Sequence, residues 1–216
     1  MNIVRNSIKF CAVLVVGASC YIAVETGYLP FWRNFAEVRN ESVIDASFSE
    51  TSYLNSNLAL DSLLNSNSDR SLITLLIEKS QRRLTIYYQN QPIKSYPVVL
   101  GGNPVGNKLR EGDGKTPEGL FGIRDLYPHP QWSKFIWIDY PTQESWENHI
   151  NAKKQGAIPA SATIGGEIGI HGVPKGRDYL VSKGQDWTLG CISLTNRDVD
   201  EIYPWLQIGT RVEIVP

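Results

Sequence analysis

Cys191 and His171 are the two residues whose types and spacing point to chemistry. The other cysteines, Cys11 and Cys20, lie in an apolar N-terminal run, so Cys191 has no partner for a disulfide in the rest of the chain. His171 ends an apolar run about twenty residues before it and precedes Gly172. An imidazole beside a thiol lowers the thiol pKa and shuttles its proton. The pair therefore predicts a cysteine nucleophile with a histidine base.

The residues around Cys191 favour this role over that of a buried, inert cysteine. Gly190 permits a sharp backbone turn, and we expect backbone N–H groups near Gly190 and Cys191 to stabilise an oxyanion. The Thr188 hydroxyl is expected to position the substrate or the imidazole. Several further residues are candidates at this site: Gly172, Trp187 and Ser193 for substrate positioning, and Asp178 or Asp186 for orienting His171.

Neither a metal nor a cofactor is expected. His129 stands in a Pro-His-Pro turn and His149 in a polar stretch, so both are predicted to be surface or loop residues. One cysteine with three scattered histidines lacks the usual ligand spacing of zinc sites. Trp132, Trp137 and Trp146 are interpreted as packing in the core or in a cleft wall.

The segment from Ile170 to Leu194, IHGVPKGRDYLVSKGQDWTLGCISL, resembles the signature of the L,D-transpeptidase (YkuD-type) catalytic domain family. The resemblance extends upstream through EGDGKTPEG at 111–119 and covers roughly Leu72 to Pro216. It implies a β-sandwich with the cysteine in a cleft. It also implies that Cys191 forms a thioester with a peptidoglycan stem peptide and releases D-Ala.

Ser193 departs from the family pattern, because many members carry an arginine two residues after the cysteine. Loss of that guanidinium removes a rigid fork of donors for a carboxylate or carbonyl. The acyl acceptor therefore stays open. An amine would give a crosslink or the attachment of a wall protein, and water would make the enzyme an L,D-carboxypeptidase or a peptidoglycan amide hydrolase. A catalytically silent wall-binding module is a third interpretation.

The elements that must position these residues are mainly strands. Short β-branched runs bounded by Gly, Pro and Asn predict the strands. One helix is predicted at Asn196 to Tyr203, capped by Thr195 and ended or kinked by Pro204. The fold class is therefore mainly β, with one or two short helices. The predicted strands cover Leu72–Glu78, Arg83–Tyr88, Ile93–Leu100, Phe121–Asp125, Phe135–Asp139, Glu167–Ile170 and Arg211–Val215.

The N-terminal part of the chain predicts an envelope location. Residues 8–24 are apolar and follow Arg5, which favours export of the C-terminal bulk to the periplasmic or extracytoplasmic face. Residues 1–25 are interpreted as a membrane anchor or a cleaved signal peptide, with the anchor favoured. Residues 26–70 are predicted to be a flexible Ser/Asn-rich spacer, with one weak helix around Leu54 to Leu64, and 71–216 the catalytic domain.

Charge and composition exclude two classes of protein. The chain carries 21 basic and 22 acidic side chains, and this near balance argues against a nucleic-acid partner. Apolar residues make up 42% and charged residues 20%, which describes a globular rather than a disordered protein. The family resemblance implies peptidoglycan stem peptides as partners, with a wall-attached protein as an alternative acyl acceptor, and residues 8–24 predict the inner membrane as a further partner.

Overall fold

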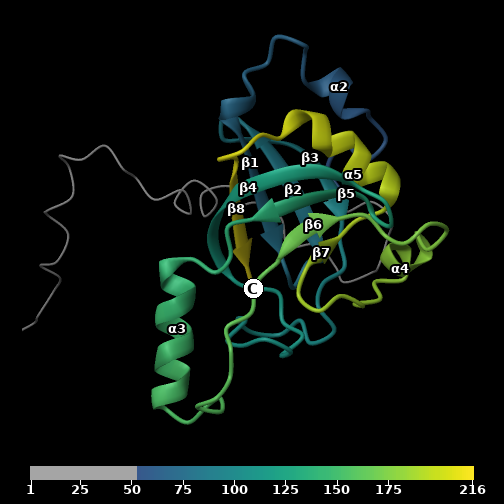
Figure 1. Cartoon of the computed structure of the whole chain (residues 1–216). Helices are drawn as coiled ribbons and strands as arrows, with labels where there is room; N and C mark the ends of the chain where they lie inside the picture. The colour runs from purple at the N-terminus through teal and green to yellow at the C-terminus, as the bar shows by residue number, and fades with distance from the viewer. Residues whose placement is uncertain (1–52) are drawn as a thin grey trace, which may run out of the picture. The chain divides into compact units, whose positions relative to one another are not determined.

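The structure, a computed structural model, describes residues 53–216, and its centre is one eight-stranded sheet (Figure 1). The strand order is β3-β2-β1-β8-β4-β5-β6-β7, antiparallel except for the pairs β1–β8 and β6–β7. The strands are β1 Ile73–Glu78, β2 Arg83–Tyr88, β3 Gln91–Pro97, β4 Gly119–His129, β5 Ser133–Ile138, β6 Gly169–His171, β7 Ile192–Ser193 and β8 Arg211–Val215.

The mainly-β prediction is confirmed, but the sheet is one curled layer rather than the two sheets of a sandwich. Its ends approach each other, because the chain after β3 bonds to β7. The Val99 N–H donates to the Ser193 carbonyl at 2.9 Å, and the Ser193 N–H donates to the Val99 carbonyl at 2.8 Å. This closure brings the segment after β3 against the strand that follows Cys191.

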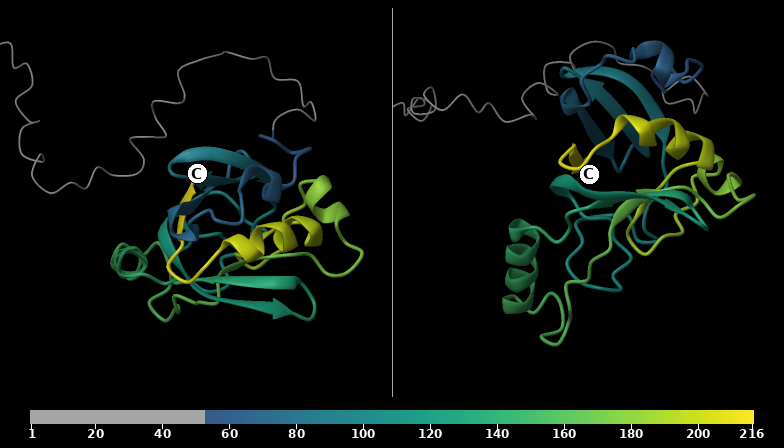
Figure 2. Two further views of the ribbon diagram at one scale, coloured as in Figure 1. Left: turned by 90° about the horizontal axis from the view of Figure 1, so that it is seen from above. Right: turned by 45° about the horizontal axis from the view of Figure 1, so that its top comes forward.

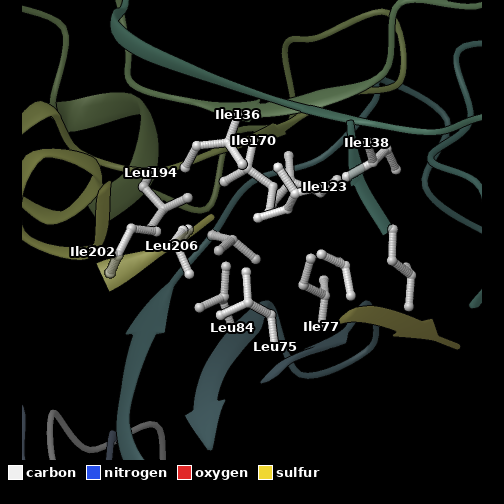
Figure 3. Close-up of a cluster of buried hydrophobic side chains, with 14 of the residues drawn as sticks. Leu75, Ile77, Leu84, Ile123, Ile136, Ile138, Ile170, Leu194, Ile202 and Leu206 are labelled. Carbon is white, nitrogen blue, oxygen red and sulfur yellow. The ribbon is translucent and has the colours of Figure 1, made fainter. Parts of the chain in front are cut away.

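The hydrophobic core lies inside the curl. Figure 3 shows Leu75, Ile77 and Leu84 of β1 and β2 opposite Ile123, Ile136 and Ile138 of β4 and β5. All six side chains are buried. These residues alternate with less buried neighbours in β1 and β4, as expected for strands with one face on the core. The core therefore fixes the register of the strands that carry the candidate site.

The helices are more numerous than predicted. They are α2 Leu60–Leu63, α3 Gln143–Lys154, α4 Tyr179–Ser182 and α5 Asn196–Ile202, with 3-10 turns at Arg70–Leu72 and Tyr203–Trp205. The Thr195 hydroxyl caps α5 as predicted, and the helix gives way to the 3-10 turn that contains Pro204. Helix α5 lies between the two halves of the curled sheet (Figure 2).

Helix α3 is the largest element that the sequence analysis missed. It is capped by Thr142, whose hydroxyl accepts from the Ser145 N–H at 3.3 Å. It stands beside the sheet in Figure 1 and buries only Ser145, His149 and Ala152. A helix with so small a buried face leaves little apolar periodicity in its sequence.

Residues 53–70, which the sequence analysis assigned to the flexible spacer, are packed against the catalytic domain. Leu60 and Leu64 are buried in the main core. The buried Lys94 ammonium donates to the Leu58 carbonyl and to both oxygens of Glu201, which also accepts from the Leu60 N–H at 2.7 Å. Two leucines and a buried cation thus fix a segment whose composition suggested a spacer.

The predicted anchor or signal at 1–25 and the spacer up to residue 52 lie outside the described residues. Among the residues that are described, no helix is both long and apolar enough to span a membrane.

Candidate active site

Cys191 sits at the end of a tight turn that Thr188 organises. The Thr188 hydroxyl donates to the Cys191 carbonyl at 2.7 Å and accepts from the Gly190 N–H at 3.2 Å. Gly190 has a φ of +144°, which L side chains rarely adopt. Cys191 as a whole residue is partly exposed. Thr188 therefore shapes the backbone around the thiol. The Gly190 N–H, which we expected to bind an oxyanion, instead donates to the Thr188 hydroxyl.

The pairing of β6 with β7 places His171 and Cys191 on one face of the sheet. Ile170 pairs with Ile192 and His171 with Ser193, both in parallel register. Cys191 directly precedes β7, two residues before Ser193, so the alternation of side chains along an extended chain gives it the same face as His171. The pairing of β6 with β7 thus places the chain segments that carry these two residues side by side.

A backbone carbonyl orients the imidazole. Nδ1 of His171 lies 2.6 Å from the Gly172 carbonyl oxygen, which can only accept a hydrogen bond. Nδ1 therefore carries the proton, and Nε2 is left as an acceptor. The buried Ser193 hydroxyl donates to the same carbonyl at 3.2 Å.

Neither of the acidic residues considered as orienting groups has that role. Asp178 accepts from the Asn196 N–H at 3.1 Å. Asp186 forms an ion pair with Arg82 and accepts from the Leu100 N–H at 2.7 Å. The Gly172 carbonyl replaces them, a role that side-chain types in a sequence do not reveal.

Burial holds both reacting groups in their neutral forms. It lowers the pKa of His171 to about 4, although the hydrogen bond to Gly172 works in the opposite direction. It also raises the pKa of the Cys191 thiol to about 11, against smaller lowering effects of the Gly169 N–H and Lys108. The sulfur donates to the Glu167 carbonyl at 3.6 Å, as a protonated thiol does. The expected lowering of the thiol pKa is therefore not found in the free protein.

Close backbone contacts pack the segment 101–116 against the Cys191 turn. A Cβ at Gly101 would lie 3.1 Å from the Cα atom of Gly190, and a Cβ at Gly190 would lie 2.7 Å from the Lys115 carbonyl oxygen. The Gly101 N–H donates to the buried Thr116 hydroxyl at 3.1 Å. The Lys79 ammonium reaches the Gly106 and Thr116 carbonyls at 2.8 and 3.0 Å. This segment therefore forms a fixed wall behind the nucleophile.

One of the two histidines predicted at surface or loop positions differs from the prediction. His149 is buried on α3, where its Nδ1 lies 2.6 Å from the Leu109 carbonyl oxygen. His129 is half-buried, and its ring stacks on Trp132 at 4.3 Å. No group of three potential metal ligands occurs within residues 53–216.

Trp132 and Phe135, for which the sequence predicts no catalytic role, both stack on the ring of His171. The centroid of Trp132 is 4.4 Å from that of the imidazole, and the centroid of Phe135 is 5.8 Å away. Trp187 meets the same ring edge-on at 5.7 Å. Phe135 pairs directly with His171 across β5 and β6, a relation that only the strand register reveals.

Known proteins share sequence similarity with this chain. A sequence profile of the YkuD family, described as the L,D-transpeptidase catalytic domain, matches residues 73–214. YafK of Escherichia coli K12, a candidate L,D-transpeptidase, is 28% identical over 159 residues, which cover 68% of this chain and 54% of YafK. YkuD of Bacillus licheniformis, also a candidate L,D-transpeptidase, is 27% identical over 150 residues, covering 69% of this chain and 70% of that protein.

Solved structures resemble the chain more distantly. The helical cell shape determining protein Pgp2 of Campylobacter jejuni has a TM-score of 0.49 and 22% identity, over 66% of this chain and 47% of Pgp2. The chain thus spans about half the length of YafK and of Pgp2. Since the family profile covers more than half of the chain, the protein belongs to the YkuD family of L,D-transpeptidase catalytic domains.

Proposed function

We propose that the protein catalyses cysteine-dependent acyl transfer on peptidoglycan stem peptides. Cys191 attacks the carbonyl of the L-configured centre of diaminopimelate, releases the terminal D-Ala and holds the acyl group as a thioester. The observation that supports this most strongly is the shared sheet face of Cys191 and His171, with Nε2 of the imidazole free to accept a proton. Family membership supports the same class of reaction.

His171 supplies the proton transfers. Because the thiol is protonated in the free protein, attack and proton transfer to Nε2 proceed together, and the imidazolium then protonates the leaving amine. The Cys191 N–H donates to no partner among residues 53–216, so it is available to the oxyanion. One such donor typically contributes about 10²–10³ in rate.

The second substrate decides whether the enzyme transfers or hydrolyses. The Ser193 hydroxyl bonds to the Gly172 carbonyl inside the protein, so it does not replace the arginine fork that many relatives present. An amine acceptor gives a crosslink or a protein attachment, and water gives an L,D-carboxypeptidase or an amide hydrolase. We propose transfer as the main reaction and an envelope location, with residues 8–24 as the membrane anchor.

The test is to incubate the full chain with a stem tetrapeptide and to identify the products by mass. Crosslinked dimers with loss of D-Ala support transfer, whereas tripeptide alone indicates hydrolysis. Cys191→Ala is the matched control. Absence of both products from the wild-type protein would exclude this substrate class.

A further inference from the structure

His171 gains a positive charge during the proposed reaction in a place where no carboxylate contacts it. The side chain is 1% exposed, and its Nδ1 is bonded to a neutral carbonyl. Asp178 and Asp186 are engaged elsewhere, with the Asn196 N–H and with Arg82. A buried imidazolium without a counter-ion is costly, so some other group must lower its energy.

The indole of Trp132 is placed to do so. Its centroid is 4.4 Å from that of the imidazole, with 24° between the ring planes. A cation within about 6 Å of an indole face is attracted by the ring quadrupole, and Trp is the best of the aromatic residues in this role. Phe135 also stacks on His171, but at 5.8 Å and with a weaker quadrupole.

The turn between β4 and β5 holds Trp132 rigidly in this position. Nδ1 of His129 accepts from the backbone N–H groups of Gln131 and Trp132, at 3.3 and 3.2 Å. The Trp132 carbonyl accepts from the Gly172 N–H at 3.0 Å. Gly172 is the residue whose carbonyl orients His171, so the indole and the imidazole are fixed to one piece of backbone.

We propose that Trp132 is a positioning residue for the reaction, whose indole face orients His171 and stabilises the imidazolium formed as Cys191 attacks. This inference rests on the proposed function. In the attack, the thiol proton passes to Nε2, sulfur bonds to the carbonyl carbon, and the carbonyl π electrons move to oxygen. The oxyanion then re-forms the C=O bond, the C–N bond to D-Ala breaks, and the proton passes from Nε2 to the departing amine.

Three variants of the full chain separate the π face of Trp132 from its bulk. Trp132→Phe keeps an aromatic face, Trp132→Leu keeps apolar cover without one, and Trp132→Ala removes both. The rate of Cys191 acylation by a stem tetrapeptide should stay within about threefold of the wild-type rate in the Trp132→Phe variant. It should fall about tenfold in the Trp132→Leu variant. Trp137→Leu is the control, since that indole lies under Arg124 and contacts Phe135 edge-on.

The second readout is the pKa of His171, followed by NMR without substrate. The Trp132→Leu variant should have a lower pKa of His171 than the wild-type protein and the Trp132→Phe variant, because the imidazolium loses its aromatic face. The Trp132→Ala variant should have a pKa of His171 raised toward the ordinary value of 6.5, because water reaches the imidazole ring. A merely structural role would reduce the folded fraction without producing these opposite shifts.

Either of two results would overturn the proposal: a wild-type acylation rate in Trp132→Leu, or equal rates in Phe and Leu together with an unchanged pKa of His171. If the wild-type protein shows no acylation at all, the proposed function fails. The NMR series then still decides whether Trp132 controls the protonation of His171. If Ala does not fold, the comparison of Phe with Leu decides alone.

Discussion

A carbonyl, rather than a carboxylate, is the hydrogen-bond partner of the His171 imidazole in this protein. The Gly172 oxygen fixes the tautomer of His171 but adds no negative charge, so burial dominates and holds the imidazole neutral. The same burial keeps the thiol of Cys191 protonated. The two groups are therefore a neutral thiol and a neutral imidazole, and in the proposed reaction the thiolate forms only as Cys191 attacks a substrate carbonyl.

This electrostatic state predicts an unusually acidic limb in the pH–rate profile. As the pH falls, protonated His171 can no longer accept the thiol proton, so acylation slows. Because the pKa of His171 is lowered to about 4, we expect the rate to hold well below the ordinary value of 6.5. The measurement is kcat/KM for acylation across acidic pH, with ultraviolet absorbance of the thiolate followed in parallel. A strong thiolate signal at neutral pH, absent in Cys191→Ala, would show an ion pair instead.

The elements around the site act through close backbone packing. The wall at 101–116 meets the Cys191 turn where glycines leave no room for a Cβ. Lys79, which follows β1, is 3% exposed, and its ammonium forms an ion pair with Glu118 at 2.8 Å. This ion pair links the end of β1 to the residues that follow the wall. The position of the thiol therefore depends on residues distant in sequence.

Gly101 and its neighbour Gly102 provide a matched test of this wall. A methyl group at Gly101 would meet the Gly114 oxygen at 2.2 Å, whereas one at Gly102 would meet no atom within 4 Å. Gly101→Ala should displace the wall and reduce kcat/KM by at least about tenfold, by analogy with small misplacements of catalytic groups. Gly102→Ala should stay near wild type in the same assay. Equal activities of the two variants would show that the wall does not position the thiol.

The packed segment before β1 predicts a stability effect at Leu60. Leu60 is 0% exposed, whereas the nearby Leu58 is 41% exposed. Leu60→Ala should lower the free energy of unfolding by about 2–5 kcal/mol, the usual range for a buried leucine. Leu58→Ala should change it by no more than about 0.5 kcal/mol. Denaturant unfolding of the two variants checks this, and similar losses would mean that the segment is not part of the core.

Several strands and the N-terminal cap of α5 were predictable from the sequence, because the residue types within each segment decide its conformation. The runs at Arg83–Tyr88 and Arg211–Val215 match β2 and β8, and Thr195 caps α5. Helix α3 was missed because its buried face is polar or small. The stacking of Trp132 on His171 was missed because it depends on the register between β5 and β6. Local sequence reports propensity, but it does not report which strands become neighbours.

At the scale of the whole molecule, closure of the curled sheet assembles the site. The bonds between Val99 and Ser193 join the segment after β3 to β7. They place the wall at 101–116 beside the turn of Cys191, while β5 and β6 bring the aromatic rings to His171. The proposed nucleophile, the proposed base and the wall thus come from three separate stretches of the chain, and the family profile spans all three.

The central claim is tested most directly by intact-mass measurement of the full chain during incubation with a stem tetrapeptide, followed by mapping of the modified peptide. We predict an acyl adduct of tetrapeptide less D-Ala on Cys191, lost on treatment with hydroxylamine and absent from Cys191→Ala. An adduct on another residue, or full turnover by Cys191→Ala, would contradict the account.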